Sequence, residues 1–403
     1  QSKTMKIAVV GAGFAGLVAA YLLEKKGYQV TVYEKEDTIG GHCRTIVRNN
    51  QCIEVGTVFS FSQNIKELLI ELNVSYSERF TYRNFFDEKF RRVEHLSFQE
   101  AKDLMSELHH LKVLLNDYKL TSNIVNYDFI HEDLQLPIST FLEKHNLCVM
   151  KNLIAPHLSS FGFGDIHTTQ AYYALTIFNL DTISAFLKSE KLLFIDKGNS
   201  ELIHQISCHI SDIRYANPVT SIEPFENQVR VQSQFDCSVF DKVLITTKLP
   251  KQVLKEETLN QIMNKIETNP YITCTFEVDD KNLVTTYFKG NLGKKNKIQF
   301  FHTFKQGSKT MTVTYTYGYQ SPQLIHDIQE ELKAAGIHVL YLIYVKQWYI
   351  FPHVKKEHLY SSFYEDLRTL QQKKNIHFIG SLVSKPVLSN LYKSVKQHID
   401  ESF

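Results

Sequence analysis

A short apolar run followed by three closely spaced glycines lies at the start of the chain and constrains its fold more than any other feature. Residues 6–10 have the length and apolarity of a buried parallel strand, and Gly11, Gly13 and Gly16 follow directly. Gly11 allows a tight turn, Gly13 lets the backbone approach a diphosphate, and Gly16 lets a helix pack closely on the strand. Residues 17–26 continue as that helix, whose free N–H groups and dipole favour an anion at its start. We therefore expect a nucleotide diphosphate to bind here.

An acidic residue after the next strand predicts how the ribose of the nucleotide is bound. Gly27 ends the helix, residues 29–33 have the pattern of a second strand, and Glu34 follows eighteen residues after Gly16. A carboxylate at that place accepts hydrogen bonds from both ribose hydroxyls and repels a 2′-phosphate. The pattern disfavours NADP and leaves FAD and NAD open.

The length and composition fit a globular protein with two domains. The 403 residues are too many for one nucleotide-binding module, and 43% of them are hydrophobic. With 22% charged residues and a formal net charge of +2, the chain has no global field that would recruit nucleic acid. No apolar stretch reaches the roughly 20 residues that span a bilayer. No charged-then-apolar signal segment precedes the first strand, so we expect a cytoplasmic protein of undetermined oligomeric state.

The cysteines and histidines show no metal-binding pattern. Six cysteines are scattered without a C-x-x-C pair, and the seventeen histidines form no H-x-x-x-H or H-E-x-x-H array. We expect free thiols rather than disulfides, and no metal.

Helical and strand-rich blocks alternate along the rest of the chain. Apolar spacing predicts helices over the central segments 96–119, 137–151 and 168–188. A terminal helix is predicted over residues 390–401, with Ser389 as its N-cap. Strands are predicted over residues 219–222, 228–232, 242–246, 276–278, 297–304, 310–317, 338–347 and 376–380.

These blocks predict an α/β fold with two interleaved domains. One is a Rossmann-type domain, and the other combines an antiparallel sheet with an inserted helical subdomain near residues 95–188. We assign to the nucleotide-binding domain residues 1–75, 190–268 and 365–403, and to the substrate domain residues 76–189 and 269–364.

A second glycine pair resembles a motif of FAD enzymes. Gly40, Gly41 and Thr45 follow Glu34 as they do in the FAD-dependent amine-oxidase superfamily, and this resemblance favours FAD over NAD. Along most of its length the chain is similar to the bacterial polyenoic fatty acid isomerases of that superfamily. The segments that carry this similarity are Glu54-Val-Gly56-Thr57, Leu136-Pro-Ile-Ser139, Phe161-Gly-Phe-Gly164 and Gln347-Trp-Tyr-Ile-Phe-Pro-His-Val354.

The resemblance implies non-covalent FAD, because no cysteine is placed to attach the flavin. Two positions depart from the superfamily pattern: His42 stands where an arginine is usual and Ser381 where an acid is usual. We expect Arg44 to supply the missing charge to the diphosphate. The implied cofactor-binding residues are Gly11, Ala12, Gly13, Phe14, Ala15, Gly16, Glu34, Lys35, Gly40, Gly41, His42, Arg44, Gly56, Thr57, Val219, Phe351, Gly380, Ser381, Asn390 and Leu391.

The resemblance also implies a substrate. In the isomerases a hydride leaves a bis-allylic carbon of a free fatty acid for flavin N5 and returns at another carbon, so double bonds move without net oxidation. This chemistry needs an apolar tunnel, a cation for the carboxylate and an aromatic wall. Arg83 is implied as the carboxylate ligand; a surface ion pair with Glu78 or Asp87 is the structural alternative. The catalytic and tunnel candidates are Arg83, Tyr82, Phe161, Phe163, Tyr349 and Phe351, with Phe178 as a further tunnel residue.

Other functions remain open on the same cofactor residues. An oxidase or dehydrogenase of an amine, a polyene or a biosynthetic small molecule would differ only in its pocket. Residues 272–278 lack the lysine that amine oxidases hold near flavin N5, which disfavours amine oxidation. The departures at His42 and Ser381 favour a third reading, a non-catalytic flavoprotein. The second glycine pair disfavours an NAD-linked dehydrogenase.

Overall fold

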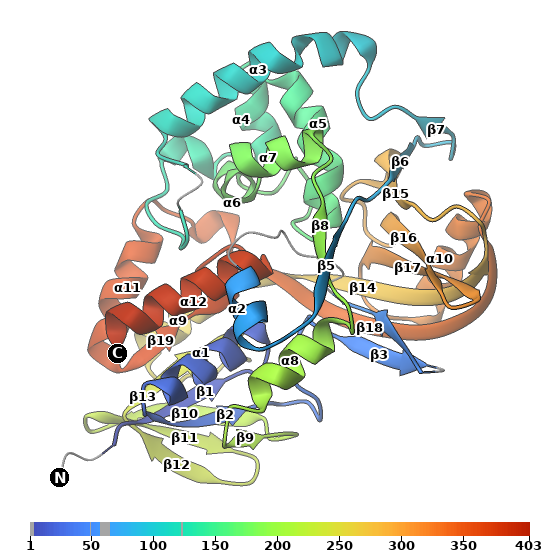
Figure 1. Ribbon diagram of the computed structural model, residues 1–403. Helices are drawn as coiled ribbons and strands as arrows, with labels where there is room; N and C mark the ends of the chain where they lie inside the picture. The colour runs from blue at the N-terminus through green and yellow to red at the C-terminus, as the bar shows by residue number, and fades with distance from the viewer. Residues whose placement is uncertain (1–3, 49, 57–64, 122–123) are drawn as a thin grey trace.

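Two large sheets, several smaller ones and a group of helices make up the molecule, as Figure 1 shows. The computed structural model describes residues 4–48, 50–56, 65–121 and 124–403. The expected α/β fold class is confirmed by this architecture.

A five-stranded parallel sheet forms the first half. Its strands, in spatial order, are β19 (Ile376–Phe378), β13 (Lys242–Ile245), β1 (Lys6–Val10), β2 (Gln29–Tyr33) and β9 (Ile213–Arg214). All four pairings are parallel. Because both faces are covered, β1 and β2 are almost continuous apolar runs rather than alternating ones.

Helices cover one face of this sheet and a small sheet covers the other. Ile7 and Val9 of β1 pack among helices, whereas Ala8 and Val10 point to the opposite face, as successive strand residues must. The helices are α1 (Phe14–Lys25), α8 (Asn199–Ser207) and α12 (Leu388–Ser402). The covering strands are β10 (Val219–Phe225), β11 (Gln228–Ser233) and β12 (Cys237–Phe240), which pair antiparallel.

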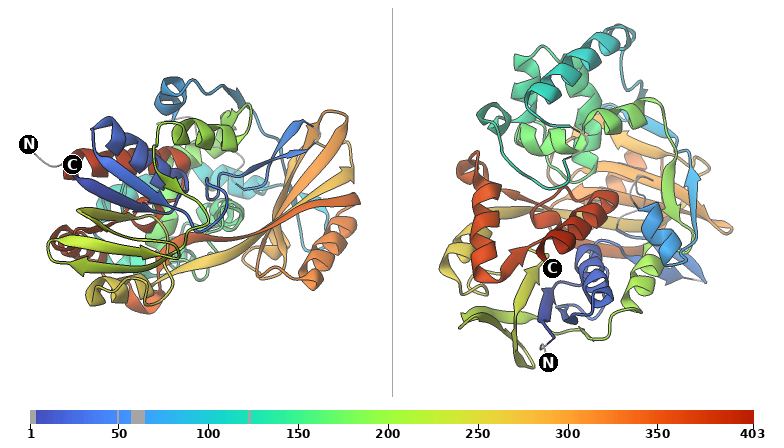
Figure 2. Two further views of the ribbon diagram at one scale, coloured as in Figure 1. Left: turned by 90° about the horizontal axis from the view of Figure 1, so that it is seen from below. Right: turned by 60° about the vertical axis from the view of Figure 1, so that its left-hand side comes forward.

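A seven-stranded sheet forms the second half. Its pairs are antiparallel except for β15 and β6, which are parallel. In spatial order the strands are β18 (His338–Val354), β14 (Ile266–Asp279), β17 (Lys309–Tyr317), β16 (Ile298–Gln306), β15 (Thr285–Phe288), β6 (Arg83–Phe86) and β7 (Arg92–Val93). Helix α10 (Pro322–Ala334) packs on its outer face. The long strands β14 and β18 run from this sheet back to the first half (Figure 2).

Five helices form the inserted helical group near the top of Figure 1. They are α3 (Phe98–Asp117), α4 (Ile138–Lys144), α5 (Cys148–Ser160), α6 (Ala171–Ile177) and α7 (Leu180–Leu187). Ser97 and Glu100 form a reciprocal capping box that fixes the start of α3. The remaining elements are α2 (Lys66–Glu71), α9 (Glu257–Asn264), α11 (Phe363–Lys374), β3 (Thr45–Arg48), β4 (Gln51–Glu54), β5 (Tyr76–Arg79), β8 (Leu192–Ile195) and the 3₁₀ helices η1 (Glu132–Gln135), η2 (Lys289–Asn291), η3 (Lys356–His358) and η4 (Gly380–Leu382).

Several element bounds differ from the sequence-based predictions. The helix predicted over 137–151 is two helices, α4 and α5, and the predicted strand 276–278 is only the end of β14. Ser389 is not the N-cap of α12, because the helix begins at Leu388. Val387 occupies the N-cap position, without a side-chain hydrogen bond.

The division into domains stays a proposal, and the topology supports it. The three segments assigned to nucleotide binding contribute all five strands of the parallel sheet.

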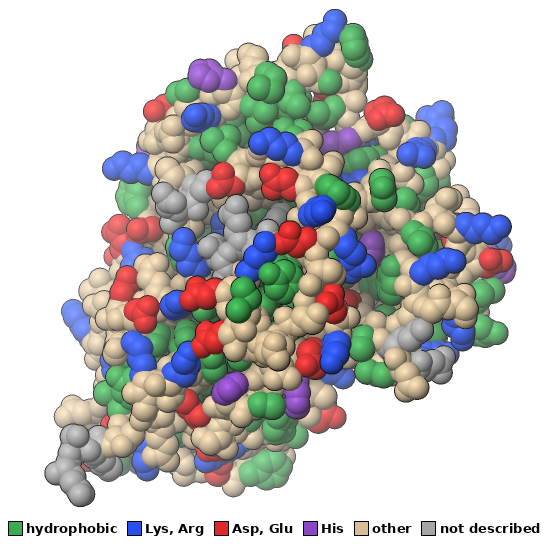
Figure 3. All heavy atoms as spheres, in the orientation of Figure 1, with side chains coloured by type: hydrophobic (Ala, Val, Ile, Leu, Met, Phe, Trp, Pro, Cys, Tyr) green, Lys and Arg blue, Asp and Glu red, His purple; other side chains and the backbone are tan. Residues whose placement is uncertain are grey.

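Within the described ranges, no helix is both long and apolar enough to cross a bilayer. On the face seen in Figure 3, basic and acidic side chains are interspersed. That face therefore carries no extended field of one sign.

Candidate active site

A large cavity lies between the glycine turn after β1 and the inner face of the seven-stranded sheet. Its volume is about 740 Å³. The glycine turn, the last residues of α5 and the segment before α12 all contribute to its walls. A cavity of this size, apolar in most of its lining, is the usual form of a small-molecule or cofactor site.

The glycine turn leaves open space in front of α1. A Cβ atom at Gly16 would lie 1.9 Å from the carbonyl oxygen of Gly11, so Gly16 is required for packing. A Cβ atom at Gly13 would meet nothing nearer than the Cα of Gly41, at 3.8 Å. Gly13 and the first residues of α1, Phe14 and Ala15, line the cavity. The arrangement fits a diphosphate at the helix N-terminus.

Glu34 is held at the end of β2 with both carboxylate oxygens fixed. The N–H of Ala12 donates to Oε1 and the N–H of Glu36 donates to Oε2, each at 3.0 Å. Burial raises the pKa of this carboxyl, and the two N–H groups oppose that rise. The backbone of Asn217 bonds to Glu34, and the buried Oδ1 of Asn217 has no hydrogen-bond partner among the described residues. These polar groups fit a ribose and base; Lys35 and Val219 line the cavity beside them.

Arg44 lies outside the cavity lining, whereas a lysine from another element lines the cavity. Arg44 bonds to the hydroxyl of Thr38, outside the cavity lining. His42 lines the cavity, but the surrounding protein lowers its pKa to about 4, so its ring is uncharged at neutral pH. Lys346 of β18 lines the same region, with its Nζ 3.4 Å from Glu36. Lys346 was not predicted, because only the pairing of β18 with β14 brings it to this wall.

The C-terminal candidates divide into two groups. Ser381 and Leu391 line the cavity, and Gly380 lies against α1, where its Cβ would be 2.7 Å from that of Ala15. Asn390 turns away: its amide donates to the carbonyl oxygens of Val125 and Lys385. Successive residues on a helix point about 100° apart, which is why Leu391 lines the cavity and Asn390 does not. Gly40, Gly41 and Gly56 line the cavity as expected, whereas Thr57 lies outside the described residues.

Arg83 lies on the inner face of β6 and lines the cavity. Its guanidinium carbon is 4.8 Å from the ring centroid of Phe186, and its side chain lies close to that of Tyr287. The two acids that could have paired with it are engaged elsewhere: Glu78 with Lys66 and Asp87 with Arg91. Across the described chain no carboxylate forms an ion pair with Arg83.

Tyr82 does not belong to the cavity, contrary to expectation. Its side chain is 74% exposed, because neighbouring residues of an extended chain point to opposite sides and Arg83 points inward.

Aromatic residues from two segments form one wall. Phe161 and Phe163 line it from the segment after α5, and Tyr349 and Phe351 line it from β18. Phe351 has a positive φ of 54°, rare for a bulky residue, and its ring meets that of Phe163 at 4.4 Å between centroids. Phe178 stacks behind Phe161 rather than lining the cavity.

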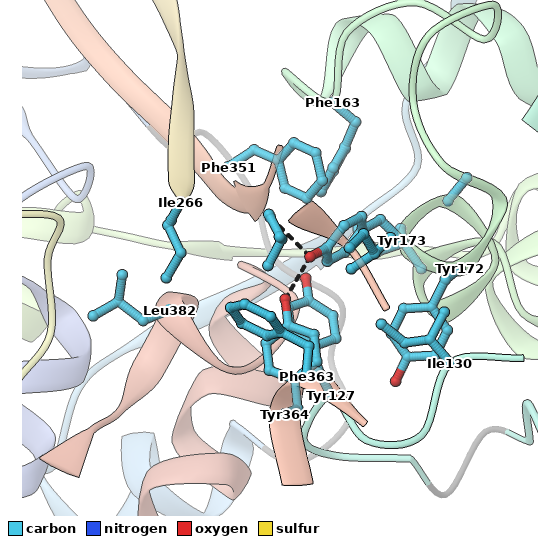
Figure 4. Packing of buried hydrophobic residues seen from close by; sticks show 14 of the residues in the cluster. Tyr127, Ile130, Phe163, Tyr172, Tyr173, Ile266, Phe351, Phe363, Tyr364 and Leu382 are labelled. Atoms are coloured by element: carbon cyan, nitrogen blue, oxygen red, sulfur yellow. Dashed lines mark hydrogen bonds between the residues drawn. The ribbon is translucent and has the colours of Figure 1, made fainter. Parts of the chain in front are cut away.

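A buried tyrosine cluster fixes the end of β18 behind this wall (Figure 4). The hydroxyl of Tyr173 accepts a hydrogen bond from the N–H of Val354 at 2.9 Å and bonds to the hydroxyl of Tyr364 at 2.5 Å. The ring of Tyr173 also meets that of Phe351 edge to face. The cluster therefore holds the unusual backbone at Phe351 in place.

A ladder of stacked aromatic rings crosses the inner face of the large sheet, and sequence reasoning missed it. Phe85, Tyr287, Phe300 and Tyr315 occupy paired positions on β6, β15, β16 and β17. Adjacent rings stack with centroids 5.2, 5.5 and 4.2 Å apart. Aromatic residues in a sequence favour strands in general. Which of them stack on one another depends on the register between the strands, which one sequence does not reveal.

Comparison with known protein families identifies the class of enzyme. Residues 14–384 match the family described as flavin containing amine oxidoreductase. The chain belongs to this family. Membership implies a flavin cofactor, and the open space at Gly13, the fixed carboxylate of Glu34 and the unpartnered oxygen of Asn217 fit one. The described residues contain no group of three or more His, Cys, Asp or Glu side chains that could hold a metal ion.

Individual relatives share shorter or more distant similarity. A 1-hydroxycarotenoid 3,4-desaturase from Flavobacterium sp. is 34% identical over 105 residues, which are 25% of this chain and 20% of that protein. A 4,4'-diapophytoene desaturase from Staphylococcus aureus is 26% identical over 112 residues, 26% of this chain and 22% of that protein. The matched parts thus span about a fifth of those relatives.

Two solved structures share the fold over the whole chain. The CLA-producing fatty acid isomerase from P. acnes superposes with a TM-score of 0.89 at 20% identity and covers 100% of both chains. The cyclohexylamine oxidase from Brevibacterium oxydans superposes with a TM-score of 0.75 at 14% identity and covers 99% of this chain and 98% of that chain.

Proposed function

We propose that this protein binds FAD non-covalently and isomerises a double bond of an unsaturated carboxylic acid with a long apolar chain. The observation that carries the proposal is Arg83, a cation without an acidic partner in the described chain, which lines the cavity beside the aromatic residues Tyr287 and Phe300. The resemblance to fatty acid isomerases and the shared fold with one of them support it.

Arg83 is suited to a carboxylate for physical reasons. A guanidinium presents two parallel N–H groups that match the two oxygens of a carboxylate. Phe186 and Tyr287 hold the side chain in one place, which lowers the entropy lost on binding. Arg83 is half-buried, and an arriving anion offsets the cost of desolvating its charge, so a free acid is preferred to an ester or an amine.

FAD, when bound, supplies a group that accepts a hydride and returns it. The residues of this chain would then hold the substrate and surround the positive charge left on its carbon chain with apolar walls. Tyr287, Phe300 and Tyr315 line the cavity and stack face to face, so their ring edges form part of these walls. The same apolar walls exclude water that would trap such a cation.

We assign cofactor binding to the cavity residues described above, with Lys346 in the role expected of Arg44. The turn at Gly11, Gly13 and Gly16 would hold the diphosphate, and Glu34 the ribose. Val387, the N-cap residue of α12, and Leu388, its first residue, border the cavity, so the backbone N–H groups of that helix start would face the flavin ring.

A polyene desaturase is the second candidate, because two of the curated relatives that match part of the chain are carotenoid desaturases. A desaturase consumes an electron acceptor with each turnover, whereas an isomerase consumes none. A hydrocarbon polyene would also leave the half-buried Arg83 without an anion, which is unfavourable. Oxygen or acceptor consumption during turnover therefore separates the two.

Substitution of Arg83 tests the proposal directly. Titration of the flavin-loaded protein with linoleate, followed by the change in flavin absorbance, should give a dissociation constant for wild type and for Arg83→Ala. Loss of a charge-assisted pair should weaken binding by roughly tenfold or more, since such bonds contribute about 1.5–3 kcal/mol. Arg91→Ala is the matched control, because Arg91 lies in a surface pair with Asp87. Equal affinity in the two variants would contradict the assignment of Arg83.

A further inference from the structure

A polar row lies beside the aromatic ladder on the same sheet face. Thr285 of β15 pairs with Arg83 of β6 on one side and with His302 of β16 on the other. Paired residues of neighbouring strands point to the same face, and all three side chains line the cavity. The cavity therefore contains a second polar group besides the guanidinium, separated from Arg83 by two strand spacings, or roughly 9–10 Å.

His302 has one ring nitrogen available to a ligand. Its Nδ1 is hydrogen-bonded to the hydroxyl of Thr285 at 2.9 Å. In the described part of the chain, Nε2 has no hydrogen-bond partner, and it is not among the buried polar atoms that lack one, so it faces the open cavity. Phe304 stacks on the ring and fixes its orientation, with centroids 5.7 Å apart.

The ring is a neutral hydrogen-bonding group rather than a charge. Burial, with a further contribution from the nearby Arg79, lowers the pKa of His302 to about 4. At neutral pH it is therefore unsuited to a second carboxylate and suited to an uncharged polar group. An alcohol both donates and accepts, so it matches Nε2 in either tautomer.

We propose that Thr285 and His302 form a second polar subsite, which binds a hydroxyl on the apolar chain of the substrate acid. This inference rests on the proposed function and names its substrate class: a hydroxylated unsaturated fatty acid. The hydroxyl lies several carbons from the carboxylate, because Arg83 turns toward Tyr287, away from His302 along the strand direction. The subsite selects and orients the substrate; no step of the double-bond chemistry passes through His302.

A matched pair of ligands tests the subsite. Ricinoleate is oleate with one added hydroxyl in the middle of the chain, and further octadecenoates carry the hydroxyl at other middle positions or near the carboxylate. Each is titrated into the flavin-loaded protein. We expect at least one acid with a mid-chain hydroxyl to bind roughly tenfold more tightly than oleate, the gain of one good hydrogen bond. A 3-hydroxy acid should show no gain.

Two substitutions of His302 separate recognition from packing. His302→Asn keeps a polar group near Nδ1, toward Thr285, and should lose the preference for the hydroxy acid while binding oleate normally. His302→Gln places its amide near the position of Nε2 and should retain part of the preference. His338→Leu, at the exposed start of β18, is the control and should leave both affinities unchanged.

The outcomes are distinct. If no mid-chain hydroxy acid binds more tightly than oleate, if the gain survives in His302→Asn, or if only the 3-hydroxy acid gains, the subsite is overturned while the proposed function stands. If the wild-type protein binds none of the acids, the proposed function fails, and this inference fails with it.

Discussion

In the proposed cofactor site, Lys346 takes the role that an arginine after the second glycine pair would have, and it comes from a different part of the fold. The position after the second glycine pair holds His42, which is neutral, and Arg44 is bonded to Thr38. Lys346 reaches the same region from β18, beside Glu36. A primary ammonium is a compact charge that suits a diphosphate oxygen. We therefore propose that Lys346 supplies the charge that the usual arginine would provide.

Removing this charge should weaken FAD binding. Lys346→Met keeps the length of the side chain and removes its charge, so we expect the FAD dissociation constant to rise roughly tenfold or more. The measurement is a fluorescence titration of apoprotein with FAD. Arg44→Met is the matched comparison and should change the constant much less. If Arg44→Met has the larger effect, the diphosphate is held by Arg44 after all.

Within six residues, the strand–turn–helix element at the start of the chain contains one glycine needed for folding and another needed for ligand binding. Gly16 faces protein and Gly13 faces the cavity. Gly13 also has an ordinary extended backbone, with φ of −75°, so a side chain there causes no backbone strain. The two glycines belong to the same sequence motif but have different physical roles.

Substitutions at these two glycines should have different effects, one on flavin binding and the other on stability. Gly13→Val should leave the apoprotein folded, with an unchanged melting temperature, and abolish flavin binding because the side chain fills the space needed by the diphosphate. Gly16→Ala places a methyl group against the Gly11 carbonyl and should destabilise the apoprotein by about 1–3 kcal/mol. Thermal unfolding and the flavin absorbance of each purified variant are the readouts. A yellow Gly13→Val protein would refute the diphosphate assignment.

A buried histidine pair joins β19 to α12 and makes stability depend on pH. His377 Nδ1 lies 3.0 Å from His398 Nε2. Burial, the other histidine and Lys242 lower the pKa of His377 to about 3, and burial and Lys242 lower that of His398 to about 4. Above the unfolded value of about 6.5 neither state is protonated. Below it the unfolded chain takes up protons that the folded chain excludes, so stability falls as pH falls toward 4.

The pair therefore predicts a measurable pH effect. The melting temperature of the wild type should drop between pH 7.5 and pH 5, and His377→Gln should reduce that drop by removing one titrating group. Each pKa unit of difference corresponds to about 1.4 kcal/mol at full titration. Buffers matched in ionic strength keep surface pairs from contributing differently. An identical drop in both proteins would show that this pair does not titrate on unfolding.

Several elements of the fold could be predicted from short-range sequence patterns. The strand 29–33 and the turn at Gly11 could be predicted because their apolar run and glycine spacing are short-range properties. The terminal helix could also be predicted, although its N-cap was misplaced by two residues. The fold class could be predicted from the alternation of blocks together with the family resemblance.

Several residues of the candidate site could not be predicted from the sequence, because they reach the cavity only through tertiary structure. Lys346, Thr285 and His302 reach the cavity through strand pairing, and register between strands far apart in sequence is not readable from one sequence. The same applies to the aromatic ladder. Tyr82 and Arg83 are neighbours in an extended segment, so a shift of one residue reverses which of them faces inward. Both were therefore candidates.

The whole-molecule test of function is an anaerobic reaction of the flavin-loaded protein with polyunsaturated fatty acids, followed by absorbance. Two signals are recorded together: the flavin bands and the near-ultraviolet band of conjugated dienes. An isomerase should build up conjugated diene over many turnovers while the flavin stays oxidised, because each hydride removed is returned. A flavin that is bleached by the acid without diene growth, or that responds to no acid at all, would contradict the proposed function.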